Sequence, residues 1–451
     1  MTFQTASVRP VRGRLASFVI AVSFAACATA AFAADDCHVG AYRLGDGRIV
    51  DIAPSEGPTL RWRMLDGETG ALAGQPGGNW RSTFGWTERK DGRNVIFSDC
   101  ASAGITFGGV NGKRIPLNVT ETRFTSGGVT LLGRLILPPG RRRVPIVVLI
   151  HGAEHDSARD FNYLQRLLPA EGVGAFVYDK RGTGGSGGEY TQDYPTLAAD
   201  AVAALGEAKR LAGARAGRVG YQGGSQGGWV APLAAKDSPV DFVIVSFGLA
   251  VSPLAEERES IEHEVRSHVP GPRGAKAADE FAAAIEQVAT SDFRDMDRLD
   301  AVRQHYSREP WFKQVGGEFA RFLLDTSDAE IRKMGPPLIS GINLDYDPMP
   351  VLRTLRIPQL WVLGGRDRDA VPYETSRRLA KLRSAGSPIT LAIYPDAEHG
   401  MTEFEMKDGE RVSTRYSSGY FKMLRDFAFH GSLGGRYGNA QILRTPRKPK
   451  S

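Results

Sequence analysis

A glycine-rich turn lies between a predicted strand and a predicted helix near the middle of the chain. Its residues are Gly223-Gly224-Ser225-Gln226-Gly227, with an apolar run over 218–222 before it and a helix-like run over 229–235 after it. A sharp strand-to-helix turn strains the residue at its tip and needs small neighbours, because the two elements approach closely. The pattern therefore predicts Ser225 as a candidate nucleophile. The motif alone is weak in a chain with 53 glycines, so its surroundings carry the argument.

Unbroken apolar runs alternate with amphipathic segments on both sides of this turn. The predicted strands are 144–150, 174–178, 241–247, 359–363 and 389–394, and the predicted helices are 161–170, 197–211, 373–382 and 420–429. Strands that are apolar throughout are buried on both faces, as in a mostly parallel sheet covered by helices. We therefore expect an α/β fold with a doubly wound, mostly parallel sheet.

The alternation is absent from the start of the chain and is interrupted once near its middle. Short runs between Gly, Asp and Asn predict a small β-rich N-terminal domain, and a charged, helix-patterned stretch predicts a cap inserted into the sheet domain. The predicted organisation is a signal peptide (1–33), the β-rich domain (34–115), the core in two parts (116–250 and 351–433), the cap (251–350) and a basic disordered tail (434–451).

The first residues have the pattern of a cleavable export signal. Arg9, Arg12 and Arg14 precede an apolar stretch over 15–26, and a small-x-small cleavage site ends at Ala33. We expect a periplasmic or secreted protein. A membrane anchor and lipidation of Cys27 are the alternatives.

Cleavage after Ala33 would leave Cys37 and Cys100 as the remaining cysteines. An oxidising compartment favours a disulfide between them, which would stabilise the N-terminal domain. Two buried thiols are the alternative.

The excess of basic residues lies at the two ends of the chain. The net charge is +6, but the signal and the tail hold more basic residues than this excess. The body therefore has no basic surface that would indicate nucleic acid as a partner. Membrane contact is not indicated once the signal is removed.

A serine nucleophile needs a base and a group that orients the base. His399 follows the last predicted core strand, and Asp367 and Asp369 follow the strand before it. Asp367 is the preferred acid, and Asp369 is the alternative.

The order Ser225, Asp367, His399 resembles that of the α/β-hydrolase family. The resemblance covers about residues 117–433 and includes His151-Gly152 after one strand and the glycine-rich run 179–186 after the next. It implies an oxyanion hole made by the backbone N–H groups of Ala153 and Gln226. In the run 179–186 we expect Asp179 to pair with Arg181.

The resemblance implies a serine hydrolase acting on a small ester or a short peptide. The sequence has no HExxH motif, no CxxC pair and no phosphate-binding GxxxxGKS/T loop, so we expect catalysis to need no cofactor and no metal. Carboxylic esters are the first choice and peptides, including aminopeptidase substrates, the second; a catalytically silent binding protein is a third. Glutamates in the cap are candidates for binding a substrate amine, and apolar cap residues either line the substrate pocket or form the cap's own core. The glutamates are Glu256, Glu257, Glu259 and Glu262; the apolar residues are Phe312, Phe319, Phe322, Leu323 and Leu324.

Overall fold

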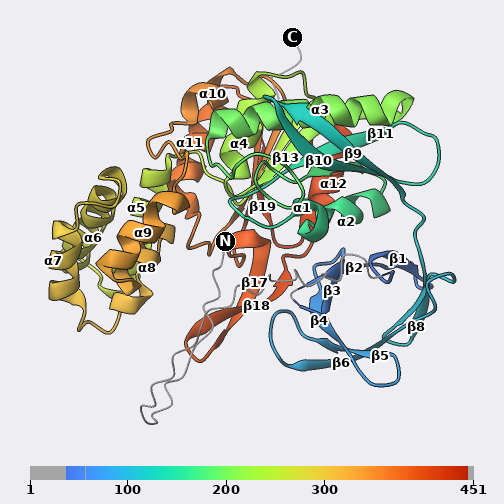
Figure 1. Ribbon diagram of the computed structural model, residues 1–451, viewed down its shortest axis with the longest axis horizontal. Helices are drawn as coiled ribbons and strands as arrows, with labels where there is room; N and C mark the ends of the chain where they lie inside the picture. Colours follow the sequence, from blue (N-terminus) through green and yellow to red (C-terminus); the bar gives the residue numbers. More distant parts are fainter. Residues whose placement is uncertain (1–36, 56, 445–451) are drawn as a thin grey trace, which may run out of the picture.

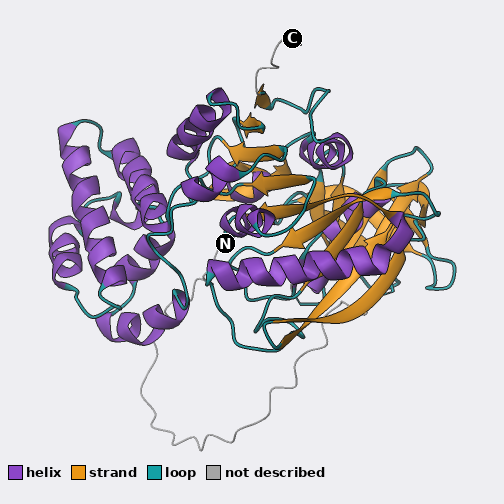
Figure 2. Cartoon of the chain, turned by 90° about the horizontal axis from the view of Figure 1, so that it is seen from above, coloured by secondary structure: helices purple, strands orange, loops and turns teal. Residues whose placement is uncertain are grey.

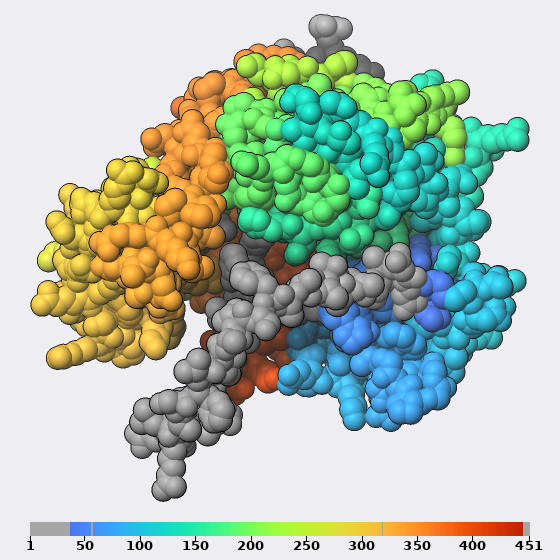
Figure 3. All heavy atoms as spheres, viewed as in Figure 1, coloured from blue at the N-terminus to red at the C-terminus, as the bar shows by residue number. Residues whose placement is uncertain are grey.

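The computed structural model describes residues 37–55 and 57–444. The predicted signal peptide, Cys27 and residues 445–451 lie outside the described residues. Figure 1 shows three parts: a blue barrel, a central sheet covered by helices, and a yellow and orange helical cap that is inserted between two stretches of the sheet domain. Figure 3 shows the cap protruding from the left side of the core and the barrel lying below the core at the right. Within the described ranges, no helix combines the length and the apolar character that crossing a membrane requires.

The N-terminal strands close into a barrel, a closure that the sequence pattern did not reveal. Its strands are β1 (Gly40–Leu44), β2 (Ile49–Pro54), β3 (Leu60–Met64), β4 (Thr69–Gly74), β5 (Asn79–Thr83), β6 (Lys90–Phe97), β7 (Gly104–Phe107) and β8 (Val110–Arg114). Strand β1 pairs antiparallel with both β2 and β8, which removes the open edges. Large side chains such as Trp62 and Phe107 fill the interior.

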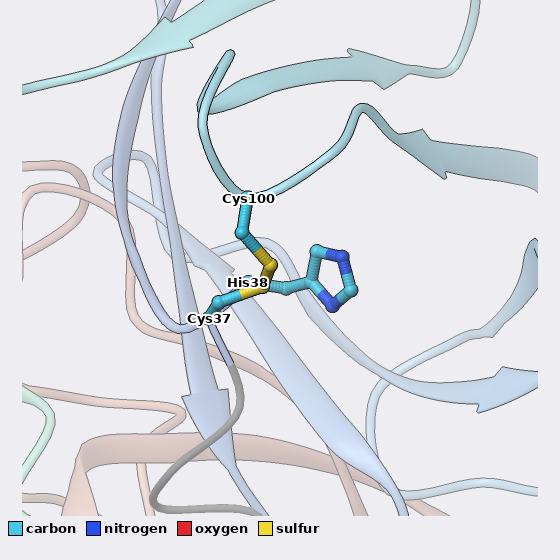
Figure 4. A group of neighbouring side chains, drawn as sticks. All are labelled: Cys37, His38 and Cys100. Atoms are coloured by element: carbon cyan, nitrogen blue, oxygen red, sulfur yellow. A yellow bond between two sulfur atoms is a disulfide. The ribbon is translucent and has the colours of Figure 1, made fainter.

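The predicted disulfide between Cys37 and Cys100 is present. It joins the segment before β1 to the loop after β6, and Figure 4 shows the sulfur–sulfur bond beside the ring of His38. That ring stacks on Phe97 with the ring centroids 4.4 Å apart.

The central sheet has nine strands in the order β19-β16-β15-β14-β13-β11-β12-β10-β9. The strands are β9 (Asn118–Ser126), β10 (Val129–Leu137), β11 (Val144–Ile150), β12 (Gly174–Tyr178), β13 (Ala216–Gly224), β14 (Phe242–Ser246), β15 (Gln359–Gly364), β16 (Ile389–Tyr394) and β19 (Gln441–Leu443). The six central strands run parallel, and β10, β9 and β19 pair antiparallel at the edges. The predicted doubly wound, mostly parallel sheet is confirmed.

Helices cover both faces of this sheet (Figure 2). They are α1 (Ala158–Phe161), α2 (Leu164–Ala170), α3 (Tyr194–Ala212), α4 (Gly227–Lys236), α10 (Met349–Thr354), α11 (Pro372–Ser384) and α12 (Tyr420–His430). One apolar cluster packs α3, α4, α10 and α11 on one face, and a second packs α2 and α12 on the other. The sheet is therefore buried from both sides, which explains why its strands are apolar throughout.

The cap is a separate group of helices with a core of its own. Its helices are α5 (Pro253–His268), α6 (Pro272–Thr290), α7 (Asp297–Tyr306), α8 (Glu318–Asp325) and α9 (Asp328–Leu338). Phe312, Leu323 and Leu324 are buried in that core, and Phe319 and Phe322 pack against it. Of the two interpretations of these apolar residues, the structure supports the cap core.

The prediction of a disordered tail from residue 434 is wrong for the residues up to 444. Strand β19 adds to the sheet edge, with Ala392 opposite Ile442. Ala440 and Ile442 pack against a core cluster, so apolar burial orders this segment despite its basic surroundings. A further hairpin, β17 (Thr402–Lys407) with β18 (Glu410–Tyr416), was not predicted.

Candidate active site

Three predicted residues follow the carboxyl ends of parallel core strands. Ser225 follows β13, Asp367 lies in the loop after β15, and His399 lies in the loop after β16. Loops at this edge of a parallel sheet form the usual ligand crevice of open α/β folds. The topology thus brings residues far apart in sequence to the same edge.

Ser225 occupies a strained turn, as the glycine pattern predicted. Its φ angle is +51°, in the left-handed region that side chains other than glycine rarely adopt. A Cβ added to Gly223 would lie 2.2 Å from the carbonyl oxygen of Gly227, so the strand and the helix could not approach this closely with larger residues. The serine N–H donates to the carbonyl oxygen of Ser246 at 3.1 Å, which fixes the turn to the neighbouring strand.

His399 lies against Asp367 rather than Asp369. Its Nδ1 is 3.0 Å from Oδ2 of Asp367. The other oxygen, Oδ1, accepts the backbone N–H groups of Asp369 and Ala370 at 3.0 and 2.8 Å. The side chain of Asp369 instead forms an ion pair with Arg321 of the cap at 2.5 Å. Asp367 is therefore the carboxylate in position to orient the imidazole.

The charge of Asp367 also affects the titration of His399. Burial alone would lower the pKa of His399, but the adjacent Asp367 carboxylate outweighs it, so the pKa lies above its ordinary value. The imidazolium that forms when the ring takes up a proton is stabilised in the same way.

The structure does not join Ser225 to His399 directly. Across the described residues, no hydrogen bond links the serine hydroxyl to the imidazole. Phe247 lies between the two loops: its ring packs edge-on against His399 at 4.9 Å and would contact a Cβ at Gly224. Hydrogen bonds between nucleophile and base are often long in unliganded enzymes, so this separation does not exclude the pair.

The two predicted oxyanion donors lie at the same edge. Ala153 follows β11, and Gln226 directly precedes α4. In the part of the chain that the structure describes, neither backbone N–H has a hydrogen-bond acceptor. The N-terminus of α4 adds a partial positive charge. Both groups are thus free to bind a developing negative charge.

Lys180 holds the loop of Ala153 in place, a contact that the sequence analysis missed. Its ammonium donates to the carbonyl oxygen of Gly152 at 2.8 Å, and the hydroxyl of Tyr190 donates to that of Ala153 at 2.7 Å. Burial lowers the pKa of Lys180 to about 8. No sequence signal links this lysine to the loop, because the contact joins residues from different loops.

The pairing expected within the run 179–186 is also wrong. Arg181 binds the buried Asp200 of α3 through two hydrogen bonds, at 2.8 and 2.6 Å. Asp179 accepts hydrogen bonds from the Ser157 hydroxyl at 2.8 Å and from the backbone N–H of Gly185 at 3.2 Å. Arg181 and Asp179 are therefore each paired with other residues and not with one another.

Among the residues that the structure describes, two groups of side chains have the donor atoms of a metal site. One is Cys37, His38 and Cys100, and the other is Asp367, Asp369 and His399. The two sulfurs of the first group are bonded to each other (Figure 4). In the second group the donors are engaged by one another and by Arg321. Neither group offers a free set of ligands, and the absence of a metal and a cofactor stays a prediction.

Two of the cap glutamates have structural roles. Glu257 accepts the backbone N–H groups of Phe319 and Ala320 at the start of α8, and Glu259 accepts that of Glu374 near the start of α11. Burial raises the pKa of Glu259 to about 7. These carboxylates therefore fix helix ends.

The hairpin β17–β18 connects the His399 loop to the barrel. The backbone N–H of Trp86 in the barrel donates to the carbonyl oxygen of Ser413 at 2.9 Å, and the Ser413 hydroxyl donates to Glu398 at 2.7 Å. In Figure 1 the hairpin extends from the core between the cap and the barrel. The barrel thus supports the segment that holds His399.

A family model and solved structures are similar to this chain. A family model described as the alpha/beta hydrolase family matches residues 147–412, more than half of the chain. Solved structures that resemble the chain include an esterase of Pyrococcus furiosus, with 17% identity and a TM-score of 0.41, over 63% of this chain and 84% of the esterase. Another is the acylaminoacyl peptidase of Pyrococcus horikoshii, with 14% identity and a TM-score of 0.41, over 84% of this chain and 55% of the peptidase.

Proposed function

Because the chain belongs to the alpha/beta hydrolase family, we propose that it is an exported serine hydrolase that cleaves carboxylic esters through an acyl-enzyme on Ser225. One observation carries this proposal. Asp367 and His399 form a hydrogen-bonded pair, at 3.0 Å, at the sheet edge where Ser225 occupies its strained turn.

In the first step, the Ser225 oxygen forms a bond to the ester carbonyl carbon, and its proton passes to Nε2 of His399. Asp367 keeps the imidazole in the tautomer that can accept this proton and stabilises the resulting cation. Collapse of the tetrahedral intermediate breaks the bond to the alcohol, which takes the proton from His399. Water then repeats the sequence on the acyl-enzyme and releases the acid.

The backbone N–H groups of Ala153 and Gln226 bind the oxyanion in both steps. Removing one such donor typically costs roughly 100- to 1000-fold in rate. Lys180 donates to the carbonyl of the same peptide unit that carries the Ala153 N–H, which orients and polarises that donor.

The engagement of cap glutamates favours esters over aminopeptidase substrates. An aminopeptidase needs an acidic group for the substrate amine, and two of the four cap glutamates, Glu257 and Glu259, already bind backbone N–H groups. A catalytically silent binding protein would have no need of the strained serine and the aspartate–histidine pair together.

Export is supported by the signal-like first residues and by the Cys37–Cys100 disulfide. Disulfides persist in oxidising compartments such as the periplasm or the extracellular space. Localisation of the tagged full-length chain by cell fractionation tests this part of the proposal. Recovery in the cytoplasm with Cys37 and Cys100 as free thiols would contradict it.

A comparison of substrates tests the ester assignment. The purified mature protein should hydrolyse 4-nitrophenyl acetate and butyrate faster than aminoacyl 4-nitroanilides. Ser225→Ala should abolish the turnover, and Ser327→Ala, at an exposed serine of the cap, should not. Turnover of the anilides without turnover of the esters would contradict the esterase assignment and support a peptidase.

A further inference from the structure

A cavity of about 190 Å³ lies at the turn of Ser225 and at the loop of the proposed oxyanion donor Ala153, because the residues that precede these two, Gly224 and Gly152, line it. Residues at the ends of β11 and β13, in α1 and around it, and in α12 form its walls. The glycine that precedes Ser225, Gly224, is among them. The cavity therefore reaches the nucleophile's turn from the side of the oxyanion loop.

Two buried residues in its wall have a polar atom or group without a hydrogen-bond partner among the described residues. His151 is 9% exposed, and its Nε2 has no partner among the described residues. Gln222 is 4% exposed and also lines the cavity; within the described part of the chain its side-chain amide makes no hydrogen bond and is not among the fully enclosed unpaired groups, so the amide is open to the cavity. Buried polar groups are normally paired, so a buried glutamine whose amide is open to the cavity and unpaired within the described residues indicates a ligand that supplies the partner. Burial lowers the pKa of His151 to about 4, so the ring is neutral at physiological pH.

Aromatic side chains form much of the remaining wall. They are Phe161, Tyr163, Phe247 and Tyr420. An apolar cavity of about 150 Å³ holds a benzene molecule in another protein, so this volume suits one six-membered ring with a short substituent. Two carboxylates, Glu154 and Asp156, also line the cavity and disfavour an anionic substituent.

The position of the cavity decides which half of an ester it would hold. The leaving alcohol must lie beside His399, because His399 gives it a proton. The cavity is lined neither by His399 nor by the loop of Asp367 nor by the cap. The group that remains on Ser225 is therefore the one that faces the cavity.

We propose that this cavity is the acyl subsite, and that it selects an uncharged, ring-sized acyl group whose neutral hydrogen-bonding substituent reaches the amide of Gln222. The inference rests on the proposed acyl-enzyme at Ser225.

The test uses 4-nitrophenyl esters, which keep the leaving group constant. The acyl groups are 4-(hydroxymethyl)benzoyl, its isostere 4-ethylbenzoyl, the anionic 4-carboxybenzoyl, and acetyl. Each kcat/KM is divided by the rate of hydroxide-catalysed hydrolysis of the same ester, which removes differences in intrinsic reactivity. We expect the hydroxymethyl ester to exceed the ethyl ester by about tenfold, because the ethyl group leaves the buried amide unpaired. The carboxylate ester should be the poorest ring substrate.

Variants locate the preference. Gln222→Leu should bring the ratio of hydroxymethyl to ethyl ester close to one. Gln359→Leu is the matched control, because Gln359 is also fully buried, lies in a strand of the same sheet and does not line the cavity; it should keep the ratio. Ala158→Leu places a larger side chain in the cavity and should lower the kcat/KM of the ring esters relative to that of the acetate ester by about tenfold or more. This variant tests the subsite even if Gln222→Leu does not fold.

The outcomes separate this inference from the proposed function. The acyl subsite would be refuted if the protein hydrolysed the acetate ester but showed no preference among the ring esters. It would also be refuted if Gln222→Leu kept the preference. Neither result would contradict the proposed serine hydrolase activity. No turnover of any ester, together with an unreactive Ser225, would overturn the proposed function itself.

Discussion

Substitution of Asp367 by Asn should abolish nearly all activity while the fold is kept. The carboxylate lies 3.0 Å from Nδ1 of His399 and is 1% exposed, so water cannot replace it. An asparagine amide can donate to Nδ1, which would place the ring proton on Nε2, where the serine proton must go. In serine proteases the equivalent change lowers kcat by about 10⁴-fold, or roughly 5.5 kcal/mol of transition-state stabilisation. We expect a loss of the same order here.

Asp369→Asn is the matched control, two residues away in the same loop. It removes an ion pair with Arg321, whose side chain is 51% exposed. Exposed pairs contribute roughly 0.2–1 kcal/mol to folding stability, so this variant should stay folded. It leaves the Asp367–His399 pair in place and should therefore keep most of the activity. Both variants are assayed for kcat and KM on 4-nitrophenyl acetate, with circular dichroism to verify folding.

The pH profile adds a readout that loss of folding would not mimic. His399 must be neutral to act as a base, so activity rises as pH increases through its pKa. In the wild-type protein that limb should lie above the ordinary value of 6.5, because Asp367 raises the pKa of His399. Asp367→Asn should move the residual limb to lower pH. A near-normal rate for Asp367→Asn combined with a collapse for Asp369→Asn would refute the assignment.

Three further predictions concern the oxyanion loop and the barrel. Lys180→Met should lower kcat, by less than the roughly 100-fold that loss of a whole oxyanion donor costs. Burial lowers the pKa of Lys180 to about 8. The neutral amine no longer polarises the oxyanion loop, so wild-type kcat should fall above that pH and the variant should lack this fall; an unchanged kcat in Lys180→Met would contradict the role of Lys180 in the oxyanion loop. Joint replacement of Cys37 and Cys100 by Ser should reduce the barrel's free energy of unfolding by about 4 kcal/mol, and denaturant titration would show an unchanged midpoint if the bond were absent. Asp51→Asn should destabilise the contact between barrel and core by about 3–5 kcal/mol, because it leaves Arg166, now 2.6 Å from the carboxylate, buried without its partner; a melting curve unaffected by the change would refute this.

The residues that local patterns place were predicted well. Gly223 and Gly227 indicated the strained serine turn, because close approach of strand and helix excludes larger side chains. Apolar runs indicated the parallel strands, because both faces of the sheet are covered. Chain order placed His399 after the last parallel strand.

Contacts between distant segments were not predictable in this way. Nothing near Lys180 in the sequence indicates that its ammonium reaches Gly152, because the fold alone brings these loops together. The polar strands β17 and β18 lack the apolar pattern of the core strands, and they are stabilised by contacts such as that between Trp86 and Ser413. Closure of the barrel depends on the pairing of β1 with β8, which is a property of the whole domain.

The most direct test of the central claim is labelling of the mature protein with a fluorophosphonate probe, followed by peptide mapping by mass spectrometry. An activated serine attacks the phosphorus and keeps the label. The account predicts a single modified peptide, labelled at Ser225, with labelling lost in Ser225→Ala and strongly reduced in Asp367→Asn. An unlabelled Ser225 in folded protein, or modification at another serine, would contradict it.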